Sequence, residues 1–456
     1  MSETARRRIL VIGGGLSGAA VAYALLSRAF KPVLVSVVGR SPLGEGAAYS
    51  STHPLHLLNV RARGMSLVDG DDAHFVRWLS SRNGAHADPD GFVPRGLYAE
   101  YVRDTLAAAD GSAREGVQLE RVFGSARSLE LTGEGARAAF EGGDSRGADR
   151  VVLALGHPPP NHPVAAGDLP LYDSARYVRD PWSAEALAEL DPDAALLIIG
   201  TNLTMFDLAL ALDARGHRGV IHAISRRGLL SLAHGPAPSA AVPWTAPPRS
   251  ARAALHALRG EARVEPASWR GVVDSIRAQT PALWSSWSDA EQRRFLRHAR
   301  PYWDVHRHRA APEIRERIDR MRADGRLRVE AARLTAFELR GDGVVVTIAP
   351  RGSSTPVTLA VARVINATGP SVDYRTWDDP LVRALLDRGW IRPGPLGFGL
   401  DATTEGAILD RDGRVSKVLS TLGPTLRGSL WETTAVPEIR AQAARLAGRI
   451  LADLGA

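Results

Sequence analysis

A glycine-rich stretch near the start of the chain restricts the fold more than any other feature of the sequence. Residues 13–18 read GGGLSG, and they lie between the β-forming run 9–12 and the Ala- and Leu-rich segment 19–26. A strand, a glycine turn and a helix in this order form the first unit of a dinucleotide-binding fold. A secretory signal peptide also combines basic and apolar residues, but it needs an unbroken apolar core, which the glycines interrupt.

Three glycines of this turn have separate tasks in a dinucleotide site. Gly13 allows the tight turn, Gly15 lets the main chain approach the pyrophosphate, and Gly18 lets the helix pack closely on the strand. Leu16 and Ser17 stand at the start of the helix, where free N–H groups face the phosphates. These five residues are the predicted phosphate contacts.

The composition excludes several classes of function. The chain has 456 residues and no cysteine, so it has neither disulfides nor the redox-active cysteine pair of a flavin disulfide reductase. Its net charge of +7 comes almost entirely from arginines scattered among acids, which indicates a solvated surface rather than a nucleic-acid site. No uncharged apolar run reaches about 18 residues, the length that spans a bilayer, so we expect a cytoplasmic protein without membrane contact.

The chain contains a second unit of the same kind. Residues 194–216 again indicate a strand, a turn and a helix, and residues 220–225 indicate the following strand. Between 236 and 312 the pattern is irregular, partly helical and rich in tryptophan, which indicates an insertion. Residues 326–364 then predict short strands around glycine turns, a β-meander.

Nine segments, in order along nearly the whole chain, resemble one bacterial family of FAD/NAD(P)-binding proteins. This family consists of two-dinucleotide-binding-domain flavoproteins related to the class B flavin monooxygenases and the N-hydroxylating monooxygenases. The segments are GGGLSG (13–18), LHLLNVRARGMS (55–66), GFVPRGLYAEY (91–101), VVLALGHPPP (151–160), LIIGTNLTMFD (197–207), AISRRGLL (223–230), FLRHARPYWDVHRHR (295–309), INATG (365–369) and LRGSLWETTAVPEIRAQA (426–443).

The resemblance implies an α/β fold with two Rossmann-like domains, in which a discontinuous FAD-binding domain receives an inserted NAD(P)-binding domain. Residues 1–165 are assigned to the first part of the FAD-binding domain. Residues 190–335 are assigned to the NAD(P)-binding-like domain, with the Trp-rich helical insertion at 236–312. Residues 336–456 are assigned to the β-meander and the return to the FAD-binding domain.

Two positions depart from the family pattern. Ser36 lies near the end of the second strand, where an acidic residue usually binds ribose, so Ser36 is the predicted ribose contact. Because it supplies one hydroxyl instead of a carboxylate, we expect it to bind the adenosine end of FAD more weakly. In the second glycine turn Asn202 replaces the middle glycine, and its side chain stands where a pyrophosphate is expected. Gly200, Leu203 and Thr204 complete the predicted contacts of this turn.

Arg226 and Arg227 follow the second strand of the second unit, at the position that selects the cofactor. Arginine there binds the 2′-phosphate of NADPH, whereas an acidic residue would bind the free ribose of NADH, so NADPH is the predicted second cofactor. A simple pair of surface arginines is the alternative.

The sequence identifies no catalytic residue outright, but it offers three candidates. By the resemblance, the segment with His56, Asn59 and Met65 passes beside the flavin ring, where the Asn59 amide can hydrogen-bond the ring edge or a substrate. Capping of loop backbone is the alternative for His56. His306 lies in a histidine-rich segment that either lines a substrate or nicotinamide pocket or makes ordinary structural polar contacts. No metal is expected there, because neighbouring arginines repel a cation and no thiolate completes a ligand set.

Four residues from the last third of the chain complete the predicted flavin contacts. Thr368 and Gly369 end a strand that we place at the ligand edge of the FAD-binding domain, and Gly423 and Thr434 precede the last helix. The free N–H groups of that helix would stabilise negative charge on the flavin. Capping of the helix by Thr433 or Thr434 is the alternative.

Together these features predict an FAD-dependent oxidoreductase, and specifically an NADPH-dependent monooxygenase that acts on a small molecule. Two other interpretations stay open. One is a flavin dehydrogenase or oxidase whose NAD(P)H site has degenerated, and the other is a non-catalytic protein that binds FAD or another nucleotide. The sequence indicates no particular oligomeric state.

Overall fold

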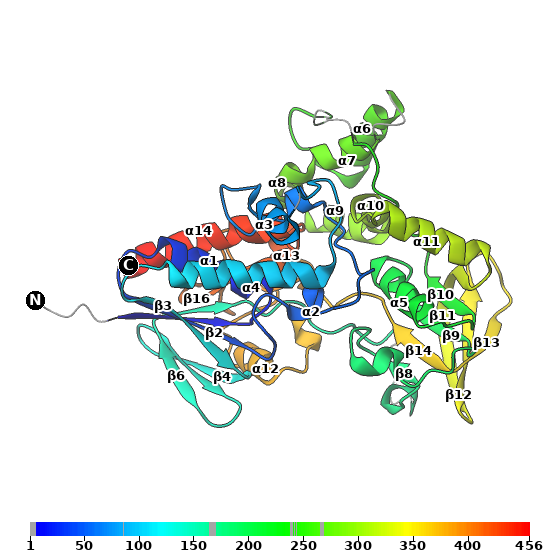
Figure 1. Ribbon diagram of the computed structural model, residues 1–456, viewed down its shortest axis with the longest axis horizontal. Coiled ribbons are helices and arrows are strands. Elements are labelled where there is room, and N and C mark those ends of the chain that lie inside the picture. The colour runs from blue at the N-terminus through cyan, green and yellow to red at the C-terminus, as the bar shows by residue number, and fades with distance from the viewer. Residues whose placement is uncertain are drawn as a thin grey trace, which may run out of the picture.

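A computed structural model gives the structure of the chain and describes residues 6–84, 86–163, 170–237, 240, 242, 244–264 and 269–456. Two mainly parallel sheets lie side by side along the longest axis, and a group of helices stands above the junction between them (Figure 1). This arrangement confirms the predicted α/β class with two Rossmann-like units.

The first sheet is built around the strand that enters the first glycine turn. Its order is β15-β16-β7-β1-β2-β3, with β15 (Ala407–Leu409), β16 (Val415–Thr421), β7 (Arg150–Leu153), β1 (Arg7–Ile12), β2 (Val33–Gly39) and β3 (Val117–Phe123). All neighbouring strands are parallel except β15 and β16. Segments from both ends of the chain therefore share one sheet, as a discontinuous domain requires.

Both faces of this sheet are covered. One face carries the helices α1 (Leu16–Arg28), α4 (Arg95–Gly111) and α14 (Val436–Leu454), and the other carries a small antiparallel sheet of β4 (Ala126–Leu131), β5 (Ala136–Phe140) and β6 (Ser145–Ala148). Ile9 and Val11 pack toward the helices, whereas Leu10 and Ile12 pack toward the small sheet. Burial on both sides explains why residues 9–12 of β1 are all apolar. The small sheet itself was not predicted.

The second sheet contains the second glycine turn. Its order is β13-β12-β11-β10-β9-β14-β8, with β13 (Val357–Val361), β12 (Gly343–Pro350), β11 (Leu327–Arg340), β10 (Ile221–Ser225), β9 (Leu196–Ile199), β14 (Arg363–Asn366) and β8 (Tyr177–Val178). The start of β11 pairs in parallel with β10, and its remainder forms an antiparallel hairpin with β12. The predicted meander is therefore an extension of this sheet.

This pairing moves one predicted domain boundary. Strands β12, β13 and β14 belong to the second sheet, so within the segment 336–456 the meander extends the second domain and the chain returns to the first sheet only after Asn366. The reason is that β11 has 14 residues, long enough to pair with both β10 and β12. The other predicted boundary, at residue 165, lies outside the described residues.

The helical insertion lies against the first domain. Its described elements are α6 (Ala251–Val264), α7 (Trp269–Ser275), α8 (Thr280–Ser286), α9 (Asp289–Arg294), a π-helix (Phe295–Ala299) and α10 (Arg300–Arg307). Trp284 and Trp287 pack in one buried cluster with Trp431 of the first domain. Arg277 also binds the carboxylate of Glu438 in α14 through two hydrogen bonds of 2.6 and 2.7 Å. The insertion thus bridges the two domains.

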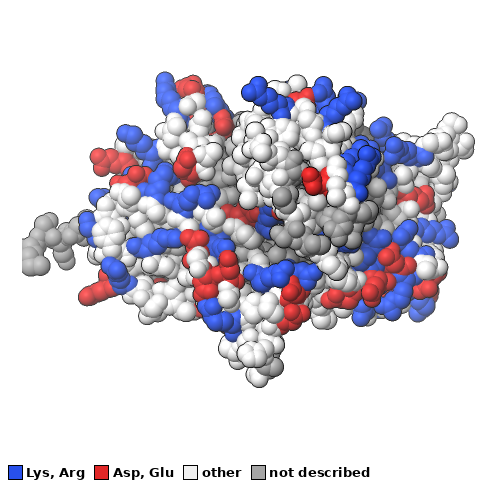
Figure 2. Space-filling model, turned by 90° about the horizontal axis from the view of Figure 1, so that it is seen from above, with Lys and Arg blue, Asp and Glu red and all other residues white. Residues whose placement is uncertain are grey.

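The remaining helices complete the layers around the sheets. They are α2 (Gly46–Tyr49), α3 (His74–Asn83), α5 (Leu203–Ala214), α11 (Pro312–Ala323), α12 (Pro380–Asp387) and α13 (Arg427–Leu430). Within the described ranges no helix is long and apolar enough to cross a membrane. Figure 2 shows basic and acidic side chains interspersed over one face of the molecule, as the scattered charges of the sequence predict.

Candidate functional site

The glycine turn after β1 has the geometry of a phosphate-binding turn. Gly13 has a φ of 115°, and a Cβ there would overlap the carbonyl oxygen of Ala154. A Cβ on Gly18 would overlap the carbonyl oxygen of Gly13. Gly15 differs, because a Cβ there would have one atom within 4 Å, Cα of Gly46 at 3.6 Å. The protein leaves the space beside Gly15 open, as the approach of a pyrophosphate requires.

The first turn of α1 presents free N–H groups to this space. The cap residue Gly15 makes no side-chain cap bond, and the N–H of Ala19 is the first in the helix to reach back, to the Gly15 carbonyl at 2.9 Å. The amides of Leu16, Ser17 and Gly18 therefore have no partner within the helix. The first turn of this fully described helix carries no acidic residue. Its positive end suits an anion.

A loop from the end of the chain closes on the same helix end. Gly423 has a φ of 76°, and a Cβ there would overlap the hydroxyl of Ser17. The Gly423 N–H donates to Oε1 of Gln442 at 2.8 Å, and Nε2 of Gln442 donates to the hydroxyl of Thr433 at 2.7 Å. That hydroxyl donates to the Gly423 carbonyl at 2.8 Å. The ring of three bonds holds the predicted residue Gly423 beside the predicted residue Ser17.

The start of α14 differs from the capping alternative. The helix begins at Val436, and its cap residue is Ala435, which makes no side-chain cap bond. Thr433 is buried in the ring of hydrogen bonds just described, and Thr434 is exposed. Neither threonine caps the helix, because both stand before the cap position. The structure gives no contact that supports Thr434 as a ligand residue.

The predicted ribose contact Ser36 is placed elsewhere. Ser36 lies within β2, three residues before its end at Gly39, and it is 7% exposed. Its hydroxyl donates to Oε2 of Glu120 at 2.6 Å, and Glu120 pairs with Arg146 of the small sheet at 2.6 Å. Because β2 runs on to Gly39, Ser36 stands inside the sheet and faces the small sheet. The prediction that Ser36 contacts ribose is corrected on this geometry.

His56 is held by both ring nitrogens at the junction of the domains. Nε2 of His56 donates to the carbonyl of Asp207 in α5 at 3.0 Å, and the hydroxyl of Ser51 donates to Nδ1 at 2.6 Å. Burial lowers the pKa of His56 to about 4, so the ring is neutral near pH 7. With both nitrogens engaged, His56 fastens the first domain to α5, and its candidate catalytic role stays a prediction.

Asp207, whose carbonyl His56 contacts, also forms a buried ion pair. Arg95 of α4 binds the carboxylate of Asp207 at 2.7 Å, with side chains 16% and 6% exposed. Burial nevertheless raises the pKa of Asp207 to about 6, while Arg95 opposes the shift. The pair and His56 together join the two domains on one side of the junction.

Asn59 and Met65, the other predicted residues of this segment, differ in their surroundings. The Asn59 carbonyl accepts a hydrogen bond from Nε2 of His234 at 3.0 Å, and the half-buried Asn59 amide makes no side-chain hydrogen bond with any described residue. Asn59 therefore stays a candidate for contact with a ligand. Met65 is 2% exposed and packs in the core under α1, so its side chain is enclosed by protein.

The second glycine turn repeats the first. Gly200 has a φ of 125°, and a Cβ there would overlap the carbonyl of Ala367. Asn202 caps α5 with an ordinary φ of −98°, and its exposed side chain makes no cap bond. The amides of Met205 and Phe206 both bond to the Asn202 carbonyl, which leaves those of the predicted residues Leu203 and Thr204 without a partner in the helix.

Thr368 and Gly369 lie beside this second turn rather than at the first. They follow β14, which pairs in parallel with β9, and the Thr368 nitrogen would be 3.2 Å from a Cβ on Gly200. In the first domain the matching position is Ala154, after β7. The predicted placement of Thr368 and Gly369 at the ligand edge of the FAD-binding domain is therefore wrong, because β14 belongs to the second sheet.

An arginine-lined pocket of about 510 Å³ lies at the end of β10. Arg227 donates to the hydroxyl of Tyr302 at 3.3 Å and to the carbonyl of Arg297 at 3.2 Å, which fixes its guanidinium. No acidic residue occurs among the described residues of the lining, which include Arg226, Arg227, Arg297, His298, Arg333 and Arg351. Several guanidinium groups around one space suit a phosphate group.

His306 lies in α10, outside the arginine-lined pocket. Its Nδ1 donates to the carbonyl of Tyr302 at 2.8 Å, and its ring meets that of Trp269 edge-on at 5.1 Å. In the same segment, Asp304 pairs with Arg300 at 3.3 Å and lies 3.9 Å from His308. A search of the described residues finds no group of three histidine or carboxylate side chains that could hold a metal ion.

Comparison with known proteins identifies the first domain. Residues 10–158 match a family model described as FAD-NAD(P)-binding. The first domain is an FAD-NAD(P)-binding domain. This match, together with the open space at Gly15, confirms the predicted class of cofactor for this domain. No curated protein matches the sequence.

Solved structures resemble the whole chain, beyond the FAD-NAD(P)-binding domain. The ornithine hydroxylase PvdA from Pseudomonas aeruginosa has 17% sequence identity and a TM-score of 0.65, with 98% of this chain and 99% of that chain covered. The ornithine N-hydroxylase of Kutzneria sp. 744 has 14% identity and a TM-score of 0.64, with the same coverage. The L-lysine 6-monooxygenase from Pseudomonas syringae has 14% identity and a TM-score of 0.63, with 98% and 100% covered. The predicted two-domain flavoprotein fold is confirmed.

Sequence reasoning missed several residues around these two turns. Gln442, which holds Gly423 beside the FAD-NAD(P)-binding turn, lies in the resembling segment 426–443, but it was given no role there. Arg333 and Arg351 reach the arginine-lined pocket from β11 and from the turn after β12. The excess of arginine was visible in the sequence, but the pairing that brings these arginines together was not.

Proposed function

We propose that the protein is an FAD-dependent monooxygenase that is reduced by NADPH and oxygenates a small molecule. The observation that carries this proposal is the pairing of two sites in one chain. The first turn leaves open space at Gly15, and the second turn stands near a pocket lined by arginines that suits the 2′-phosphate of NADPH. The whole-length resemblance to the ornithine and lysine hydroxylases supports the same activity.

The chain's own residues would hold the two cofactors at the helix ends. Gly15 and the free amides of Leu16 and Ser17 would bind the FAD pyrophosphate, and those of Leu203 and Thr204 would bind that of NADPH. Arg226 and Arg227 would bind the 2′-phosphate. Bound FAD supplies the redox chemistry, which is acceptance of hydride from NADPH and activation of O₂. The protein's part is to orient the two cofactors and the substrate and to exclude water.

One observation favours a second function, a flavin dehydrogenase or oxidase that takes its hydride from the substrate. Asn202 presents an exposed side chain where the first turn has the open space of Gly15. Met205 moreover stands where the first turn has Gly18. The change at Asn202 crowds the pyrophosphate position of the second turn, whereas Met205 is buried and changes how the helix packs on the strand.

Rapid mixing of the FAD-loaded protein with NADPH or NADH without oxygen separates these functions. The monooxygenase proposal predicts that NADPH bleaches the flavin absorbance near 450 nm faster than NADH does. Admission of air should restore the absorbance. Bleaching by substrate together with indifference to NADPH would favour the dehydrogenase or oxidase. A colourless protein that takes up no added FAD would overturn both and leave the non-catalytic nucleotide-binding protein.

Arginine variants test the cofactor preference. The variant Arg226→Ser should raise KM for NADPH about tenfold or more, because a hydrogen bond to a charged group contributes about 1.5–3 kcal/mol, and should leave KM for NADH unchanged. Arg328→Ser is a matched control, since Arg328 is exposed on β11 and does not line the pocket. Equal effects of Arg226→Ser on both nucleotides would contradict the assigned 2′-phosphate contact.

We further propose that the protein works as a small-molecule enzyme in the cytoplasm, where NADPH is available. The proposal includes no nucleic-acid partner and no membrane partner. Fractionation of cells that express the natural protein tests the location, and recovery with the membrane fraction would refute it.

A further inference from the structure

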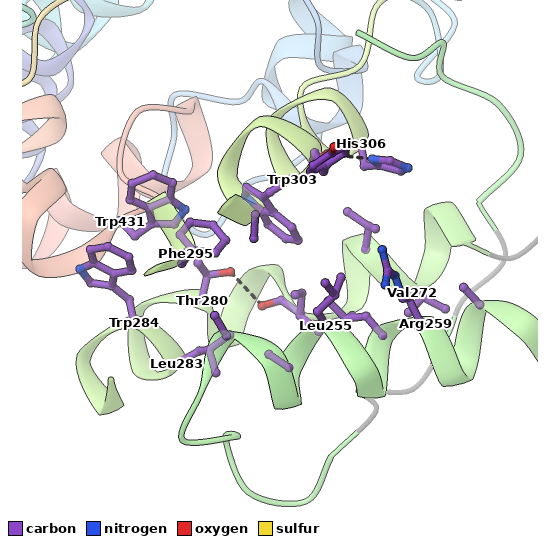
Figure 3. A pocket seen from close by; sticks show the side chains of 18 of the residues that line it. Leu255, Arg259, Val272, Thr280, Leu283, Trp284, Phe295, Trp303, His306 and Trp431 are labelled. Atoms are coloured by element: carbon purple, nitrogen blue, oxygen red, sulfur yellow. Dashed lines mark hydrogen bonds between the residues drawn. The ribbon is translucent and has the colours of Figure 1, made fainter. Parts of the chain in front are cut away.

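A cavity of about 420 Å³ lies within the helical insertion, apart from both glycine turns. It is enclosed by α6, α7, α8, the π-helix and α10, and Trp431 of the first domain completes one end. Figure 3 shows Trp431, Trp284 and Phe295 at this end, and His306 and Arg259 at the opposite end. The volume falls in the range of about 300–1,000 Å³ that holds small-molecule ligands.

Aromatic rings form the end of the cavity that meets the first domain. The rings of Trp284 and Trp431 are stacked, 4.9 Å apart and inclined by 26°, and Phe295 meets Trp431 edge-on at 5.3 Å. The indole N–H of Trp284 donates to the carbonyl of Gly428 at 2.7 Å, which fixes the ring. A rigid aromatic wall of this kind favours a flat apolar group.

The described lining of the cavity carries one arginine and no acidic side chain. The arginine is Arg259, and the lining also contains His298 and His306. Arg259 is exposed at the mouth and makes no ion pair with any described residue. His306 donates through Nδ1 to the Tyr302 carbonyl, so its ring does not offer that N–H to a ligand. A cationic ligand such as a diamine would lose its hydration here without gaining a counter-charge.

The cavity shares a wall with the arginine-lined pocket. His298 of the π-helix lines both spaces, and Tyr302, which lines the cavity, accepts the hydrogen bond from Arg227. π-Helical segments occur frequently at functional sites. A molecule in the cavity therefore lies next to the pocket that we assign to the 2′-phosphate of NADPH.

We propose that the cavity binds an aromatic carboxylate, with its ring system against Trp284 and Trp431 and its carboxylate toward Arg259. The assignment of this ligand as the substrate rests on the proposed function, whereas its binding rests on the cavity alone. The substrate class would then differ from the amino-acid substrates named for the ornithine and lysine hydroxylases, whose chains share the fold.

Titration with 2-naphthylacetate tests the binding step. The protein is titrated by calorimetry, with and without FAD, against 2-naphthylacetate, 2-naphthylacetamide and L-ornithine. The proposal predicts that the carboxylate binds about tenfold more tightly than the amide, as one charge-assisted hydrogen bond would give, and that L-ornithine does not bind. Binding of L-ornithine in preference to both aromatic compounds would overturn the proposal.

Two variants locate the ligand. Arg259→Gln should bring the affinities for the acid and the amide within about twofold of each other, and Leu255→Glu should weaken the acid about tenfold by like-charge repulsion at the cavity. Arg252→Gln is the matched control, because Arg252 is exposed on the same helix and does not line the cavity. Unchanged preference for the acid in Arg259→Gln would also overturn the assigned orientation.

The role as substrate is tested separately. In the FAD-loaded protein, 2-naphthylacetate should speed NADPH oxidation at least fivefold over its amide. Failure of NADPH to reduce the flavin, with binding intact, would defeat the proposed function and leave the cavity assignment standing. If NADPH is oxidised rapidly but the carboxylate does not bind, the cavity assignment is wrong and the proposed function still stands.

Discussion

The substitution Gly15→Ala tests the central assignment, because the structure predicts opposite effects on stability and on binding. Gly15 has φ −72° and ψ −169°, which alanine adopts freely. The added methyl group would meet Cα of Gly46 at 3.6 Å, an ordinary contact. The folded protein should therefore tolerate the change and gain up to about 1 kcal/mol, since alanine restricts the unfolded chain.

The same methyl group should block the pyrophosphate. It would stand in the space that the first turn leaves open and would push a diphosphate away from the free amides of α1. Loss of one such bond to a charged group costs about 1.5–3 kcal/mol, which corresponds to about tenfold or more in the Kd for FAD. If two such bonds were lost, we expect the protein to lose its FAD during purification.

The assay combines thermal unfolding with titration of the FAD-free protein by FAD. Gly448→Ala is the matched control, because Gly448 lies in α14 and a Cβ there has no neighbour within 4 Å. Gly18→Ala should instead destabilise the fold, since its methyl group would overlap the Gly13 carbonyl. If Gly15→Ala melted like the wild type and bound FAD just as tightly, no pyrophosphate lies against this turn and the redox assignment is refuted.

Three further predictions follow from the junction of the domains and the second turn. Asn202→Gly should lower KM for NADPH severalfold in steady-state assays, because it removes the exposed side chain from the phosphate position; an unchanged KM would show that Asn202 is no obstacle. His56 has a folded pKa of about 4 against 6.5, so the unfolded chain takes up a proton first as pH falls, and up to about 3 kcal/mol of stability is lost between about pH 6.5 and 4. Denaturant titrations of His56→Gln should show a shallower loss over that window, and an identical pH dependence would contradict the buried neutral ring. Arg95→Ala should destabilise the protein by about 3 kcal/mol in the same titrations at pH 7, because it leaves the carboxylate of Asp207 buried and unpaired. A loss of stability below about 1 kcal/mol would contradict the proposed importance of this ion pair.

Local elements were predictable where the local pattern is strong. The last helix was expected after Thr434 and is observed as Val436–Leu454, and the strand expected over 220–225 is Ile221–Ser225. The two glycine turns were also located, because only glycine fits the left-handed backbone at Gly13 and Gly200. Each of these features depends on residues that are neighbours along the chain.

Predictions that needed a strand's partner were less successful. Thr368 and Gly369 were assigned to the first domain, although β14 pairs with β9 of the second. Ser36 was assigned to ribose, although its partner Glu120 comes from β3. The small sheet β4–β6 was not expected at all, since its strands are short and half-exposed.

The sequence by itself determined the kind of turn at two points of the chain and the order of the elements around them, because glycine conformation and apolar periodicity act over a few residues. Only the tertiary structure decided which sheet each strand joins, which arginines gather at the second turn, and that an aromatic cavity forms in the insertion, with no acid in its described lining. These outcomes depend on packing between segments far apart along the chain. Such contacts are selected by the shape and burial of whole surfaces and leave no local pattern.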